Sequence, residues 1–187
     1  MSRSATTAYV AIPPVDRALH WLIALGIVAM IPLGILSEEM DKGAVRDLVF
    51  NSHMALGLAI LVLATWRVGR RLGEGFPKPV GSYPVHERAV AHLVHALLLA
   101  MTILAPLTGL ARIIGRGRPL AVFGVTLLPA GPGNEAVAAF ARAFHSGPVL
   151  VLGLGLIIVL HVVGALKHHL VDRDATLARM TGRARAA

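Results

Sequence analysis

Four long stretches of the sequence are mainly apolar and contain no Asp, Glu, Lys or Arg. They are Ala18–Leu36, Leu48–Trp66, Ala89–Ala111 and Gly147–Leu166. A helix of about 20 residues crosses the hydrocarbon core of a bilayer, and each stretch is close to that length. The pattern predicts four transmembrane helices.

A fifth apolar stretch, Pro119–Pro132, is interrupted by Gly124, Pro129 and Gly131. It is too short and too broken to span a membrane, so we expect a loop or a short interfacial helix there. The first stretch is expected to be a mature helix rather than a signal peptide, because Ser37-Glu38-Glu39 follows it in place of a small-residue cleavage site. Residues 1–187 are therefore predicted to form one all-α domain, a four-helix membrane bundle with a short interfacial segment between the third and fourth helices.

Composition and charge agree with a membrane location. Hydrophobic residues make up 56% of the chain and charged residues 15%, whereas soluble domains carry about 25% charged residues. The net charge of +8 does not indicate a nucleic-acid partner, because the basic residues flank the apolar stretches. On one side of the predicted bundle lie 12 Lys and Arg residues and on the other side 6. The side with more basic residues is normally cytoplasmic, so both termini are predicted to be cytoplasmic.

The chain has no cysteine and nine histidines. The lack of cysteine excludes disulfides, iron–sulfur clusters, thiolate zinc sites and covalently attached haem. Ionisable residues inside a membrane are candidates for function, since burying them without a partner is costly. The positions of the histidines therefore become the main question.

Six histidines lie in or beside the predicted helices, and they fall at two depths. The outer depth holds His53 on the second helix and His145 just before the fourth. The inner depth holds a larger group: His20, His92, His95 and His161. Imidazoles from facing helices are a common way to hold haem in a bundle, and two of them on one iron favour electron transfer because no coordination position stays open.

Pairing by depth suggests two cross-helix sites, His53 with His145 and His20 with His161. A lone membrane histidine is more often a packing or interfacial residue, so the argument depends on the pairs. His92 and His95 share one helix face and compete for the inner site. His168 and His169, at the end of the last helix, are expected to be interfacial.

Several local motifs, spread over nearly the whole chain, resemble those of the bacterial cytochrome b561 family, the di-haem four-helix membrane cytochromes that include superoxide oxidases. The motifs are Leu19-His20-Trp21-Leu22, His53 with Gly57 and Arg67, Ala91-His92-Leu93-Val94-His95, Pro106-Leu107-Thr108-Gly109, Arg116-Gly117, Phe123-Gly124, His145, His161 with Ala165-Leu166-Lys167-His168-His169, and Arg173-Asp174 with Arg179-Met180.

The resemblance implies two haem b groups, one bound by His20 and His161 and the other by His53 and His145. It also implies exchange with the quinone pool, with ubiquinone as the electron acceptor, in a bacterial inner membrane. One feature departs from the family, which usually spaces the last two histidines about 14 residues apart, on nearly one helix face. Here His145 and His161 are 16 apart. A helix that starts near Pro148, with His145 in the preceding loop, would accommodate the spacing, and so would a bulge at Gly153 or Gly155.

Three functions fit these observations. The first is a self-contained oxidoreductase that moves electrons from a periplasmic donor to quinone, and superoxide is one specific donor. The loop between helices three and four has a net charge of +3, which suits an anionic donor, although haem propionates would explain it equally well. The second is a haem-bearing anchor that relays electrons for a partner dehydrogenase or hydrogenase. The third is a haem-free transporter or metal-handling scaffold.

Overall fold

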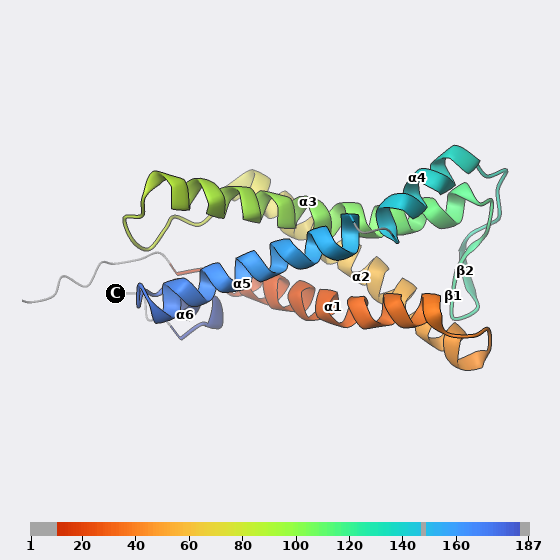
Figure 1. The fold of residues 1–187 in the computed structure, drawn as a ribbon, viewed down its shortest axis with the longest axis horizontal. Coiled ribbons are helices and arrows are strands. Elements are labelled where there is room, and N and C mark those ends of the chain that lie inside the picture. Colours follow the sequence, from red (N-terminus) through yellow and green to blue (C-terminus); the bar gives the residue numbers. More distant parts are fainter. Residues whose placement is uncertain (1–10, 147–148, 184–187) are drawn as a thin grey trace, which may run out of the picture.

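The computed structural model describes residues 11–146 and 149–183. Three long helices come first, α1 (Pro14–Glu39), α2 (Ala44–Glu74) and α3 (Val85–Gly115). A hairpin of β1 (Leu120–Val122) and β2 (Val125–Leu128) follows, then α4 (Glu135–His145), a π-helical segment (Val149–Leu154), α5 (Gly155–Leu170) and the short α6 (Thr176–Thr181). The long helices run alongside one another in an elongated bundle (Figure 1).

The predicted membrane helices are present, and α1, α2 and α3 are each longer than the apolar stretch that predicted them. In the described part of the chain, four spans are long and apolar enough to cross a membrane. The fourth, Glu135–Leu170, combines α4, the π-helical segment and α5, and its residues 147 and 148 are not described. At most 17% of the residues in the apolar stretch of each span are buried inside the protein. Large apolar side chains such as Leu25, Val62 and Leu152 therefore point outward, where lipid would cover them.

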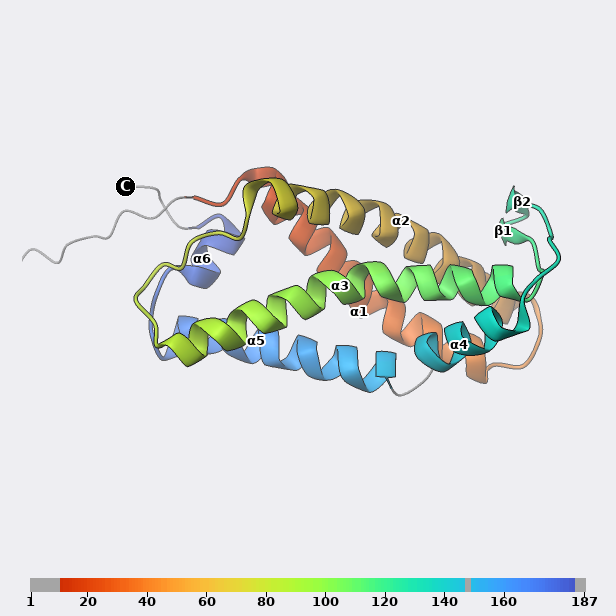
Figure 2. The same ribbon diagram turned by 90° about the horizontal axis from the view of Figure 1, so that it is seen from above.

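Helices adjacent in sequence pack against each other, α1 on α2 and α2 on α3, and α5 lies against α3. The described chain starts and finishes at one end of the bundle, which we call the terminus end (Figure 2). There the indole nitrogen of Trp21 donates a hydrogen bond of 2.9 Å to the carbonyl of Met180. The opposite end carries the hairpin and α4, and we call it the hairpin end.

The segment between α3 and α5 differs from the prediction. The interfacial helix considered for Pro119–Pro132 is absent, and an antiparallel hairpin occupies that stretch instead. Phe123 and Gly124 form its turn with positive φ angles of 49° and 82°, as a tight hairpin turn requires. The amide of Phe123 donates to the side-chain oxygen of Asn51, which fixes the hairpin to α2.

Helix α4 was not predicted at all. It packs against α3 so closely that a Cβ at Gly115 would lie 2.7 Å from the backbone nitrogen of Ala138. His145 is the last residue of α4. The prediction that His145 lies in a loop before the fourth helix is therefore wrong. Gly147 and Pro148 lie outside the described residues.

Candidate haem-binding sites

Three histidines meet near the terminus end of the bundle, and we call them the terminus-end group: His20 on α1, His95 on α3 and His161 on α5. The ring centres of His20 and His161 are 6.0 Å apart, with their planes at 69°. The ring centres of His95 and His161 are 5.3 Å apart, with their planes at 71°. The structure thus places both of the competing residues, His20 and His95, next to His161.

His92 lies apart from this group. Its Nδ1 is 2.7 Å from the carbonyl oxygen of Arg88, one turn earlier on α3. Phe76 packs between the two α3 histidines, edge-on to His92 at 6.2 Å and stacked on His95 at 6.1 Å. Of the two residues that were expected to compete for the inner site, only His95 faces His161.

His53 on α2 and His145 at the end of α4 form the hairpin-end pair. Their ring centres are 6.0 Å apart, with their planes at 87°. His145 Nδ1 lies 2.8 Å from the carbonyl oxygen of Ala105. A carbonyl only accepts, so Nδ1 carries the hydrogen and Nε2 presents its lone pair. A histidine that ligates a metal is usually held in this way by its other ring nitrogen.

The spacing of the rings fits an iron atom between them. A metal–imidazole bond is about 2 Å long and the ring centre lies about 1 Å behind the nitrogen, so two rings on one iron have centres about 6 Å apart. Both cross-helix pairs meet this requirement. The residues present therefore fit haem iron.

Glycines leave room for the hairpin-end pair. A Cβ at Gly34 on α1 would lie 3.1 Å from His53 Cε1, and one at Gly109 on α3 would lie 2.9 Å from His145 Cε1. These glycines also mark depth, because Gly34 is 14 residues after His20 and Gly109 is 14 residues after His95. At 1.5 Å per residue the two sites are separated by about 21 Å along the bundle.

Arg67 is a close neighbour of the terminus-end group. Its Nη1 lies 3.0 Å from His20 Nδ1. A guanidinium only donates, so His20 Nδ1 accepts and the ring hydrogen sits on Nε2. The ring hydrogen therefore lies on Nε2 in His20 and on Nδ1 in His145.

Two further cations, one at each end of the bundle, form ion pairs. Lys167 Nζ lies 2.7 Å from Glu87 and 3.1 Å from Asp172. At the hairpin end, Arg112 lies 2.7 Å from Glu38 and donates a hydrogen bond of 2.6 Å to Ser146. These ion pairs tie neighbouring helices together. Arg116, Arg118 and Arg142 are exposed at the hairpin end.

A bundle of lipid-facing helices that encloses facing histidines has the architecture of a membrane haem protein. The family model of prokaryotic cytochrome b561 matches residues 11–183. The chain belongs to this family and is a bacterial membrane cytochrome b; proteins of this family bind haem b.

Curated relatives match along most of their length. Cytochrome b561 homolog 2 of Escherichia coli is 30% identical over 90% of this chain and 90% of its own. The protein named probable superoxide oxidase CybB of Yersinia pestis is 29% identical over 87% of this chain and 90% of its own. Cytochrome b562 of Cereibacter sphaeroides is 31% identical over 87% and 89%. Family membership argues against the haem-free transporter.

Proposed function

We propose that this protein is a di-haem oxidoreductase that carries electrons between a donor at the hairpin end and quinone at the terminus end. The observation that carries the proposal is the placement of two facing histidine pairs, each with ring centres 6.0 Å apart, about 21 Å from each other along the bundle. His53 and His145 would hold one haem b, and His20 and His161 the other. Ubiquinone in the bilayer is the proposed acceptor.

The side chains around these sites perform simple tasks. When bound, haem supplies reversible one-electron transfer, and two histidines on one iron leave no open position for oxygen. The Ala105 carbonyl orients His145, and the glycines at 34 and 109 let α1 and α3 approach the rings.

The hairpin end is proposed to face the periplasm of a bacterial inner membrane. The support is the excess of basic residues at the terminus end, 12 against 6. Both termini would then be cytoplasmic.

Superoxide is the donor we propose. One relative is named a probable superoxide oxidase, and three exposed arginines, Arg116, Arg118 and Arg142, lie at the hairpin end. Arg112 contributes little to attracting an anion, because Glu38 pairs with it at 2.7 Å. Exposed basic groups around a site raise the encounter rate of a small anion, and added salt weakens the effect.

The test uses purified protein in liposomes that contain ubiquinone, with an enzymatic source of superoxide outside. We expect the bands of reduced haem to appear, ubiquinol to accumulate, and added superoxide dismutase to abolish both. A variant with Arg116, Arg118 and Arg142 all changed to Gln should be reduced more slowly by superoxide and with less dependence on salt, yet normally by dithionite.

Two outcomes would contradict the proposal. If superoxide reduces the haem but no ubiquinol forms, quinone is not the acceptor. If neither occurs and a dehydrogenase or hydrogenase copurifies from native membranes and restores both, the protein is an anchor subunit.

A further inference from the structure

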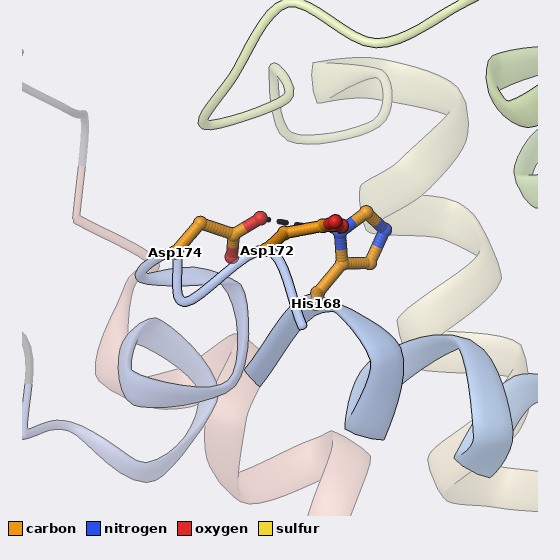
Figure 3. Close-up of side chains that lie close together, drawn as sticks. All are labelled: His168, Asp172 and Asp174. Carbon is orange, nitrogen blue, oxygen red and sulfur yellow. Dashed lines mark hydrogen bonds and ion pairs between the residues drawn. The ribbon is translucent and has the colours of Figure 1, made fainter. Parts of the chain in front are cut away.

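Three side chains with metal-binding atoms meet where α5 ends, outside the terminus-end group (Figure 3). His168 Nδ1 lies 2.8 Å from Asp172 Oδ2 and 3.1 Å from Asp174 Oδ2. The three ligand atoms all lie within 4.8 Å of one another. His168 comes from the last turn of α5, and the two aspartates come from the segment that leads to α6.

Neighbouring groups hold the aspartates in place. Asp174 Oδ1 accepts a hydrogen bond of 2.7 Å from the amide of Thr176, and Asp174 Oδ2 accepts one from the hydroxyl of Tyr83. Burial alone would raise the pKa of Asp174, but these hydrogen bonds outweigh it and hold the pKa below its ordinary value.

A single hydrogen on His168 Nδ1 cannot make good hydrogen bonds to both Asp172 and Asp174. Both carboxylates approach the same ring nitrogen, and a neutral imidazole has at most one hydrogen there to donate. That hydrogen can point directly at only one of the two oxygens, and the two negative charges repel each other. A dication in place of the proton would bind the nitrogen and both oxygens.

We propose that His168, Asp172 and Asp174 form a binding site for a divalent transition-metal ion, with Zn²⁺ as the best-matched ion. One imidazole and two carboxylates suit zinc, whereas Ca²⁺ and Mg²⁺ prefer all-oxygen sites. Three protein ligands leave a fourth position for water. The three side chains are 13–25% exposed, so an ion can enter from solvent.

The site is separate from the proposed haem ligands and does not rest on the proposed function. His168 follows His161 by seven residues, about two turns, which places it near the same face of α5 and about 10 Å further along. The competing interpretation is an ion-pair network without metal, in which Lys167, 3.1 Å from Asp172, offsets part of the charge of the two aspartates.

The test measures zinc bound to the haem-loaded protein, prepared without a histidine tag, by equilibrium dialysis and elemental analysis at neutral pH. We expect one zinc per chain at micromolar free zinc, in the presence of excess Mg²⁺. His168→Ala should lower the affinity at least tenfold. His169→Ala, which removes the adjacent exposed histidine, is the matched control and should bind zinc as the wild type does.

Asp172→Asn is the second variant, because Asp174 also anchors the chain to Thr176 and Tyr83, and its loss could disturb folding. Asp172→Asn should also lower zinc affinity at least tenfold while the haem spectrum stays unchanged. The proposal is overturned if the wild type binds no zinc at micromolar concentration, if Mg²⁺ displaces it, or if His168→Ala and Asp172→Asn bind as the wild type does.

Discussion

Gly109→Ala introduces one methyl group beside the proposed hairpin-end haem site. The new Cβ would lie 2.9 Å from Cε1, 3.3 Å from Nε2 and 3.4 Å from Nδ1 of His145. Ordinary contact begins at 3.4 Å, so the His145 ring must move back by several tenths of an ångström or α3 must shift away from it. Alanine is the better helix former by about 1 kcal/mol, so intrinsic helix propensity favours the variant and any loss comes from the contact.

The ring has little freedom to move. It is held by the 2.8 Å contact of Nδ1 with the Ala105 carbonyl, and its centre is 6.0 Å from that of His53. Overpacking of this kind costs about 1–3 kcal/mol. Haem affinity at the hairpin end should therefore fall by roughly five- to a hundred-and-fifty-fold. The terminus-end group, about 21 Å away, should keep its haem.

The assay is the haem-to-protein ratio from pyridine haemochrome spectra, with a redox titration that resolves the two haems. Gly164→Ala is the matched control, because this glycine lies on α5 and no atom of the described residues lies within 4 Å of the added Cβ. The control should carry two haems. The haem kept at the terminus end shows that Gly109→Ala is folded. If Gly109→Ala retains both haems with wild-type spectra, potentials and affinity, the close fit around His145 does not matter for haem binding.

Three further predictions concern the histidines and the topology. The purified protein should contain two six-coordinate, low-spin haems b. His53→Ala should remove only the hairpin-end haem, and His161→Ala should remove only the terminus-end haem. A single haem or a high-spin spectrum in the wild type would show that the pairing of the histidines is wrong. His20→Ala should abolish the terminus-end haem while His95→Ala and His92→Ala keep it, and the reverse result for His20 and His95 would make His95 the ligand. Reporter enzymes fused to the C-terminus should be active only in the cytoplasm and those inserted in the hairpin only in the periplasm, and a periplasmic C-terminus would invert the proposed orientation.

The four membrane helices could be predicted because a bilayer requires long uncharged stretches, and such stretches are visible in the sequence. Their ends could not be located in the same way. Helix α2 continues past Arg67 to Glu74, and α3 begins at Val85, before Glu87 and Arg88. Charged residues mark the edge of the hydrocarbon, whereas the helix itself continues into the interface as long as its backbone hydrogen bonds are satisfied.

Helix α4 was missed although its start carries a readable signal. Asn134 caps the helix by accepting a hydrogen bond of 3.1 Å from the amide of Val137, and Glu135 follows in the first turn. An Asn before an acidic residue is typical of a helix start. Helix α4 is not part of a long uncharged stretch, because it contains the charged residues Glu135 and Arg142.

The 16-residue spacing of His145 and His161 shows why pairing histidines by their depth in the membrane is safer than pairing them by their angular position around a helix. An angle counted along the chain is meaningful only if the helix is unbroken, and here His145 ends α4 while His161 lies on α5, beyond the π-helical segment. A π turn contains an extra residue, so it changes the rotation of everything that follows. The bulge suggested at Gly153 or Gly155 falls at this segment, Val149–Leu154, and at its junction with α5.

A break of a few residues changes depth less than it changes rotation, because the α-helical residues on both sides of the break still advance the chain by about 1.5 Å each. Depth in the membrane cannot, however, distinguish between two histidines that lie at the same depth. His20 and His95 both reach His161, and the distinction between them lies in their partners. Arg67 donates to His20 Nδ1, so iron binding through Nε2 requires His20 to give up its ring hydrogen or Arg67 to move. If His20 is the ligand, Arg67→Gln should leave the terminus-end haem bound and shift its midpoint potential; an unchanged potential would mean that Arg67 has no contact with the ligand when haem is present.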